Sequence, residues 1–190
     1  MTTARPLRRD AQRNRDLLVA AARRVFAEDG LDAALEDVAK EAGVSIGTLY
    51  NRFPTRGKLV DAAMADKVAE MVGLADDIVA IDDPWLAFTT LLERAGELQA
   101  ADRGYNELCC RVFDDADVIN AHHERGAALM RRIIDRAHAA GVLRRDFDVA
   151  DLSWVTWSIA RTIETAPGDL WRRQLAFLLD GLRAPGRLEA

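Results

Sequence analysis

The stretch from Leu35 to Phe53, LEDVAKEAGVSIGTLYNRF, constrains the fold of this chain more than any other. Its residue types meet the packing needs of two short helices that cross steeply through a turn of three or four residues. Ala39 is small where the helices approach, Gly43 supplies the positive φ of the turn, and Val44 anchors the turn in the core. The residues predicted to line the inner face are Leu35, Val38, Leu49 and Phe53. An ordinary helical corner can show the same spacing, so the surrounding residues must decide.

Apolar periodicity and helix breakers together predict an all-α chain. Leu18, Ala22 and Phe26 recur at the spacing of one helical face, with arginines on the other sides. No stretch alternates apolar and polar residues as a half-buried strand would, so we predict no sheet. The predicted helices are Asp10–Asp29, Ala33–Ala42, Ser45–Arg52, Arg56–Ala80, Trp85–Ala101, Tyr105–Phe113, Val118–Ala140, Val149–Glu164 and Asp169–Leu182. The predicted breakers are Gly30, Gly43, Gly104, Gly141, Pro167-Gly168 and Pro185-Gly186.

Three polar residues are placed to cap helix starts. Asp32, Ser45 and Thr55 precede predicted helices, where a side-chain oxygen can accept a hydrogen bond from a free amide of the first turn. Pro54 supports the last of these, because a helix rarely continues through the residue before a proline. We therefore expect three N-terminal helices and a long fourth helix that connects them to the rest of the chain.

Charge is distributed unevenly along the chain. The net charge of −5 argues against a nucleic-acid partner, but residues 1–60 hold 11 Lys and Arg against 8 Asp and Glu, which leaves 15 against 23 for the remainder. In the first 26 residues, the arginines are opposed only by Asp10 and Asp16. Such a basic segment suits a polyanion, so the N-terminal part is the candidate for binding nucleic acid.

No motif for catalysis, metal binding or membrane insertion stands out. The chain has no run of 18 apolar residues and no apolar stretch behind its basic N-terminus, so we place it in the cytoplasm. Cys109 and Cys110 are adjacent, and a buried structural role for one of them is favoured over redox sensing, which stays open. His122 and His123 point about 100° apart on a helix, which favours a solvated helix start over a metal site. HExxH, CxxC and P-loop motifs are absent, and we predict neither an enzyme nor a cofactor.

The run GVSIGTLYNRF, residues 43–53, followed by PTRGK, resembles the N-terminal domain of the TetR family of bacterial transcriptional regulators. The resemblance covers about residues 10–62, and the string FAEDGLDAALEDVAKEAGVSIGTLYNRFPTRGKLVDA is similar to an actinobacterial subset. The rest of the chain matches only in length and helical character. The resemblance implies an N-terminal three-helix helix-turn-helix DNA-binding domain and a larger C-terminal helical ligand-binding and dimerisation domain, which we place at residues 1–60 and 61–190.

The resemblance also implies that the helix Ser45–Arg52 enters the major groove of double-stranded DNA. An Asn amide can pair with adenine, an apolar side chain can touch a thymine methyl, and glycine permits close approach. We assign base contacts on these grounds to Ile46, Gly47 and Asn51. The residues assigned to phosphates are Ser45, Thr48, Tyr50, Lys58 and Arg13.

One departure from the family pattern concerns the start of the second helix. Family members usually carry Thr or Ser just before the residue corresponding to Leu35, where Ala33 and Ala34 stand here. A phosphate contact at this point therefore rests on backbone amides alone.

Aromatic residues are concentrated in the second part of the chain. At helical spacing they most often form a core, but the resemblance also favours an apolar effector pocket between the helices. The candidate lining of this pocket is Trp85, Phe88, Leu92, Phe113, Met130, Ile134, Trp154 and Trp157. The last two predicted helices are apolar on wide faces, which packing against the same helices of a second subunit would satisfy.

The sequence therefore predicts a homodimeric DNA-binding regulator, a repressor that an unknown small-molecule effector releases from a palindromic operator. A helical enzyme or carrier that contains a helical corner, and a DNA-binding protein without an effector, are the alternatives. Activation in place of repression also stays open.

Overall fold

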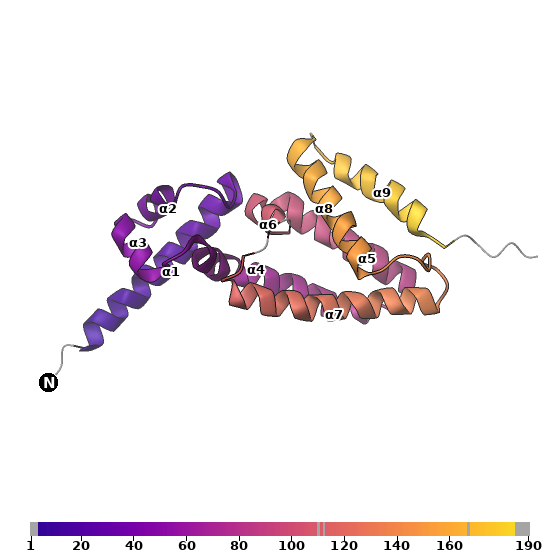
Figure 1. Cartoon of the computed structure of the whole chain (residues 1–190), viewed down its shortest axis with the longest axis horizontal. Helices are drawn as coiled ribbons and strands as arrows, with labels where there is room; N and C mark the ends of the chain where they lie inside the picture. The colour runs from indigo at the N-terminus through magenta and orange to yellow at the C-terminus, as the bar shows by residue number, and fades with distance from the viewer. Residues whose placement is uncertain (1–3, 110, 112, 167, 185–190) are drawn as a thin grey trace, which may run out of the picture.

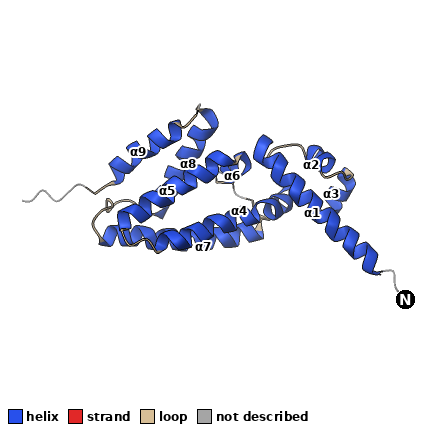
Figure 2. Ribbon diagram, turned by 180° about the vertical axis from the view of Figure 1, so that it is seen from behind, coloured by secondary structure: helices blue, strands red, loops and turns tan. Residues whose placement is uncertain are grey.

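The computed structural model describes residues 4–109, 111, 113–166 and 168–184, and within these residues the chain forms nine α-helices. They are α1 (Ala4–Asp29), α2 (Leu35–Glu41), α3 (Ile46–Arg52), α4 (Arg56–Val79), α5 (Pro84–Ala101), α6 (Arg103–Leu108), α7 (Asp117–Ala139), α8 (Val149–Thr165) and α9 (Leu170–Leu182). The molecule is elongated, with α1 to α3 at one end (Figure 1). The described residues contain no strand and one isolated antiparallel bridge, between Leu143 and Arg183 (Figure 2). The prediction of an all-α fold is confirmed.

The helices α1, α2 and α3 enclose a small apolar core. Leu18, Ala22 and Phe26 are fully buried along one face of α1. Gly30 and Gly43 follow α1 and α2 with φ of +86° and +68°, the left-handed region that favours glycine. The residues predicted for the inner face of the helix-turn-helix are all buried, namely Leu35, Val38, Leu49 and Phe53.

The predicted cap at Asp32 is wrong, whereas those at Ser45 and Thr55 are confirmed. Helix α2 follows Ala34, which offers no side-chain cap. The carboxylate of Asp32 instead accepts two hydrogen bonds from Arg111, at 2.8 and 2.6 Å. A bidentate pair with a guanidinium is stronger than a bond from a neutral amide, and Arg111 is too far along the chain for local sequence to reveal it.

Two helix boundaries and one predicted breaker also differ from expectation. Helix α1 begins at Ala4, so the basic segment before Asp10 continues the helix. Helix α6 ends at Leu108, well before the predicted Phe113. Gly104 does not interrupt the chain but lies buried inside α6. The predicted breakers Pro167, Pro185 and Gly186 lie outside the described residues.

Helix α4 pairs with α7 more extensively than any other two helices pair. Near its start, Asp61 accepts a hydrogen bond from the Ile119 amide at 2.9 Å, and near its end the Val79 carbonyl accepts one from Arg136. These links show that the two helices run in the same direction, so both begin beside α1 to α3 (Figure 1). Helices α5, α8 and α9 complete the C-terminal part.

The turn between α1 and α2 docks on α6. The Glu107 carboxylate accepts a hydrogen bond from the Leu31 amide at 2.8 Å and fills the space beside Gly30, where a Cβ would collide with it. Gly104 lies so close to Phe26 that an added Cβ would come within 2.7 Å of the Phe26 carbonyl oxygen. The absence of a side chain at these two glycines is what lets the two parts approach.

We expect Gly104→Ala to lower the free energy of unfolding by about 1–3 kcal/mol, because the new methyl group overpacks a contact with rigid backbone. Gly73→Ala is the matched control: Gly73 lies in α4 with open space around its Cα. There alanine should stabilise by about 0.5–1 kcal/mol, since it restricts the unfolded chain. Urea unfolding followed by circular dichroism measures both, and equal effects of the two substitutions would contradict the docking contact.

Candidate DNA-binding interface

Helix α3 turns one side to the core and the other to solvent. Leu49 is fully buried, whereas Gly47, Tyr50 and Asn51 are exposed. Ile46 is half-buried and packs on the core, so only part of its side chain faces outward. The exposed side of α3 therefore carries two of the three residues predicted to contact bases, together with the outer edge of the third.

Ser45 fixes the start of α3. Its Oγ accepts a hydrogen bond from the Thr48 amide at 3.2 Å and lies 2.9 Å from the Thr48 hydroxyl. Two of the predicted phosphate ligands are thus joined in one polar pair at the helix start. Residues 43–47, GVSIG, also fit the GxSxG pattern of hydrolase nucleophiles, but that motif needs a strand before the serine, and here helix α2 precedes the turn.

Lys58, in the first turn of α4, is bound to the C-terminal part of the chain. Its Nζ lies 2.7 Å from Asp117 Oδ2 at the start of α7. This hydrogen bond, helped by the negative charges of Asp117, Asp115 and Asp61, raises the pKa of Lys58. The partner was missed because the acidic run 114–117 was interpreted only as a solvated helix start.

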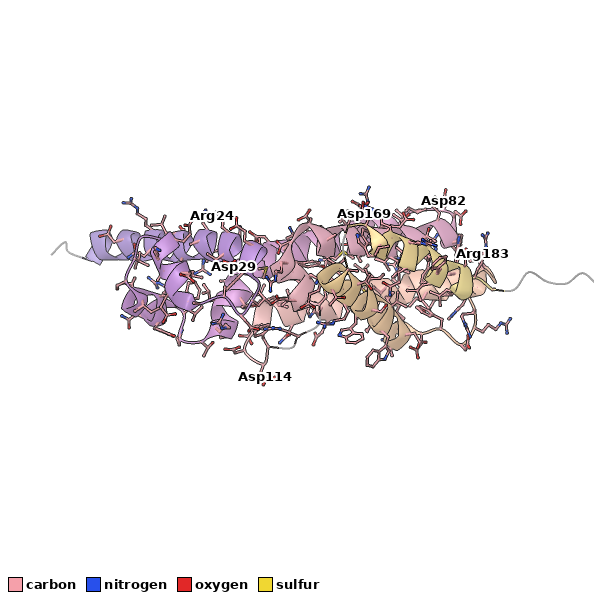
Figure 3. All side chains as sticks on the ribbon, turned by 90° about the horizontal axis from the view of Figure 1, so that it is seen from above. Arg24, Asp29, Asp82, Asp114, Asp169 and Arg183 are labelled. Carbon is pink, nitrogen blue, oxygen red and sulfur yellow. The ribbon has the colours of Figure 1, made fainter. Side chains whose placement is uncertain are left out.

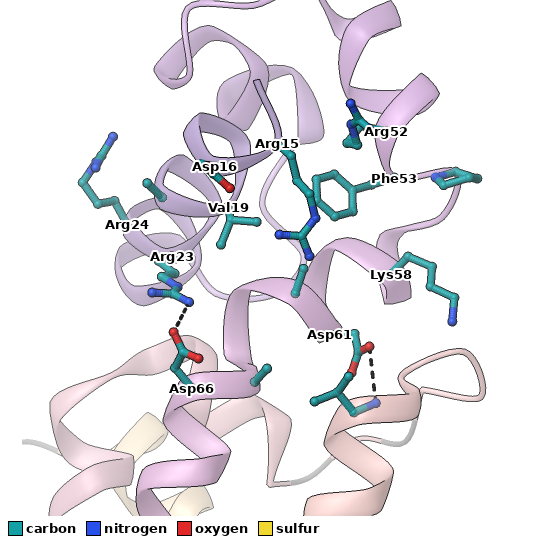
Figure 4. Close-up of a pocket in the computed structure, with 15 residues that line it drawn as sticks. Arg15, Asp16, Val19, Arg23, Arg24, Arg52, Phe53, Lys58, Asp61 and Asp66 are labelled. Carbon is teal, nitrogen blue, oxygen red and sulfur yellow. Dashed lines mark hydrogen bonds and ion pairs between the residues drawn. The ribbon is translucent and has the colours of Figure 1, made fainter. Parts of the chain in front are cut away.

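A basic groove lies between α1, the end of α3, the start of α4 and α7, with a volume of about 1010 Å³ (Figure 4). Arg23 donates to Asp66 at 2.5 Å, and the Arg15 guanidinium lies over the Phe53 ring, 5.8 Å from its centroid. The charged residues of the groove are Arg15, Arg23, Arg24, Arg52, Lys58, Asp16, Asp61 and Asp66. Arg13, predicted to contact phosphate, is exposed on α1.

Other kinds of site find little support in the part of the chain that the structure describes. Charged side chains cover its surface from Arg24 on α1 to Arg183 after α9 (Figure 3). No helix there is both long and apolar enough to cross a membrane. The described His, Cys, Asp and Glu residues form no group of three or more that could hold a metal ion. Cys109 is exposed, and Cys110 lies outside the described residues.

The eight residues predicted to line an effector pocket do not all come together. Phe88, Leu92 and Ile134 are buried, and Trp85, Phe113 and Met130 are half-buried. The tryptophans of α8 do not line the interior of the subunit: Trp154 is 67% and Trp157 43% exposed. The reason is their spacing of three residues, which puts both on the outward face of the helix. Phe147 was missed, and its ring meets that of Phe88 edge to face at 5.5 Å.

An apolar surface covers the outer sides of α8 and α9. We define the C-terminal apolar surface as Trp154, Trp157, Leu170 and Phe177, which are between 43% and 67% exposed. The two tryptophan rings meet edge to face at 5.9 Å. Large apolar side chains gathered on two neighbouring helices mark a contact surface rather than scattered surface residues.

Two family models match this chain. The model for bacterial regulatory proteins of the tetR family matches residues 18–63, and the model for the C-terminal domain of SbtR-like transcriptional regulators matches residues 83–184. The first covers the helix-turn-helix, and the second covers α5 to α9 apart from its first residues.

Solved structures and a curated relative agree with these matches. A TetR transcriptional regulator from Streptomyces coelicolor is 35% identical, with 90% of this chain and 99% of that chain covered and a TM-score of 0.58. A TetR regulatory protein from Mycobacterium vanbaalenii is 30% identical, with 94% and 100% covered and a TM-score of 0.55. An HTH-type transcriptional regulator of Staphylococcus aureus is 33% identical over 84 residues, which are 43% of this chain and 44% of that protein. The chain thus matches less than half the length of this curated relative.

Proposed function

The chain belongs to the TetR family of DNA-binding transcriptional regulators, which are not enzymes, and from this premise we propose that it is an effector-responsive repressor that binds a palindromic operator as a homodimer. The observation that carries the proposal is the solvent-exposed side of α3, held in place by the buried Leu49 and Phe53. A cytoplasmic location follows from the proposal, since the partner is chromosomal DNA.

In this proposal α3 is the recognition helix and lies in the major groove. Its exposed side brings Asn51 and Gly47, with the edge of Ile46, to the base edges. The DNA backbone is contacted by Ser45, Thr48, Tyr50, Lys58 and Arg13. The DNA-binding domain spans residues 1–60, and the effector-binding and dimerisation domain spans residues 61–190, with α4 shared between them.

We expect substitutions at Lys58 and Asn51 to affect DNA binding in different ways. Lys58→Ala should weaken binding to all sequences alike and reduce the salt slope by about 1 per site, because a phosphate contact is lost. Asn51→Ala should change the preference among sequences, at about 1–3 kcal/mol for the base it reads. Selection of bound fragments from genomic DNA, followed by titrations at several salt concentrations, measures both effects.

The control for this experiment is Arg132→Ala, which removes an exposed positive charge from α7, far from α3. It should leave affinity and sequence preference unchanged. Wild-type affinity and preference in both the Lys58 and the Asn51 variants would refute the assignment of α3 and α4 to DNA.

The homodimer is proposed to form through α8 and α9. The C-terminal apolar surface would be covered by the same surface of a second subunit, as a two-fold interface requires. The pairing places two copies of α3 on one face of the dimer, where they meet two half-sites of a palindrome.

We expect the double substitution Trp154→Glu and Phe177→Glu to produce a monomer, because it would bury charges in the proposed interface. Operator affinity should fall with the loss of the second recognition helix. Leu86→Glu is the matched control, since Leu86 is 52% exposed on α5, outside this surface. Sedimentation velocity gives the mass of each variant; a dimer that survives the double substitution places the interface elsewhere.

The effector response is assigned to the interior of the C-terminal domain. Phe88, Leu92 and Ile134 form the buried part of the proposed site, with Trp85, Phe113 and Met130 at its edges. An effector that binds there favours a state in which the two recognition helices no longer match successive grooves. Compounds found by a thermal-shift screen should weaken operator binding in titrations. A compound that binds the protein and tightens operator binding, or leaves it unchanged, speaks against repression relieved by an effector.

A further inference from the structure

The start of α4 is already bound to anionic groups of the protein itself. The Thr55 hydroxyl, which accepts a hydrogen bond from the Lys58 amide, also bonds the Asp115 carboxylate. The same carboxylate lies over Gly57, where an added Cβ would collide with it. Lys58 Nζ is bound to Asp117 Oδ2 at 2.7 Å. Two carboxylates therefore face the first turn of α4, the part of the helix where a phosphate would be favoured.

The position of these carboxylates is fixed by a third acidic residue. Asp61, only 8% exposed, lies in the second turn of α4 and accepts hydrogen bonds from the amides of Val118 and Ile119, at 3.4 and 2.9 Å. It thereby caps α7, whose own N-cap residue Ala116 offers no side chain for the purpose. The start of α7 is thus tied to the start of α4, and Asp117 is held within reach of Lys58.

We propose that Asp117 and Asp115 are built-in competitors of DNA phosphates, which occupy Lys58 and Thr55 until the DNA backbone displaces them and so lower the affinity for all DNA sequences alike. The inference rests on the proposed DNA contact of Lys58. An ammonium group hydrogen-bonded to a carboxylate at 2.7 Å must give up that bond to place the same proton on a phosphate oxygen.

The exposure of the pair makes this exchange feasible. The side chains of Lys58 and Asp117 are 39% and 79% exposed, so the ion pair is weak and salt-sensitive. A DNA duplex, with its high density of phosphates, can displace a single carboxylate. Because phosphates are the same in every sequence, the competition lowers non-specific binding as much as operator binding and helps the protein to leave non-specific DNA.

The test is a double-mutant cycle on the full-length protein with operator and non-specific duplexes. Asp117→Asn keeps the shape of the side chain, and we expect it to tighten binding to both duplexes by about 3- to 25-fold. An exposed ion pair shifts an equilibrium by up to about fivefold, and a dimer on DNA breaks two of them. In the Lys58→Ala background the same substitution should have almost no effect, because the competitor has lost its target.

Asp114→Asn is the matched control, since it removes an equal charge from the same exposed segment without touching the Lys58 hydrogen bond. It should change affinity much less than Asp117→Asn. Asp115→Asn provides a second variant, which should tighten binding through Thr55. Thermal unfolding of each variant shows whether it is folded.

The outcomes separate this inference from the proposed function. A gain that is equal with and without Lys58, or equal for Asp114→Asn, reflects only the general field of the acidic segment and overturns the competition. Weaker binding by Asp117→Asn overturns it too, because Asp117 would then orient Lys58 for DNA. If neither the wild-type protein nor any variant selects DNA, the proposed function itself fails.

Discussion

Helix α4 belongs to both ends of the molecule, and its burial limits what every other helix can do. Its apolar residues are buried from Leu59 to Ile78, largely against α7, so the helix cannot rotate or slide without exposing a close-packed core. Its first turn carries Lys58 and follows directly on the recognition helix. The position of α3 relative to the C-terminal domain is therefore set by how α4 lies on α7, and a change in the packing of α7 reaches the DNA-binding end as a tilt of one rigid helix.

Electrostatic pairs reinforce this mechanical link. The N-terminal part of the chain is basic and the remainder acidic, and they meet through pairs such as Lys58 with Asp117 and Arg23 with Asp66. One pair is reversed, with Arg111 of the acidic part on Asp32 of the basic part. Such exposed pairs add little stability. Their effect is on the field around the DNA-binding surface, where each carboxylate reduces the positive charge that a phosphate meets.

The features predicted correctly from sequence depend on neighbours in the chain. Ser45 and Thr55 cap helices through amides three residues away, Gly43 has the φ its turn requires, and most helix ends fall at the expected breakers. The failures involve partners distant in sequence. Asp32 is taken by Arg111, and Gly104 serves a contact with Phe26 instead of a turn. For the candidate site, the residues of α3 and α4 could be named from sequence, but the carboxylates that occupy Lys58 could not, since they lie on a helix far along the chain.

The docking of the α1–α2 turn on α6 bears on how such a chain evolves. Glu107 requires a glycine at position 30, Phe26 requires one at position 104, and Asp115 requires one at position 57. Each of these glycines lies in one part of the chain and accommodates a group from the other part. The helix-turn-helix of this protein is therefore not an exchangeable module: a natural or engineered recombination near residue 60 would separate matched surfaces, and the two halves have to be inherited together or readjusted together.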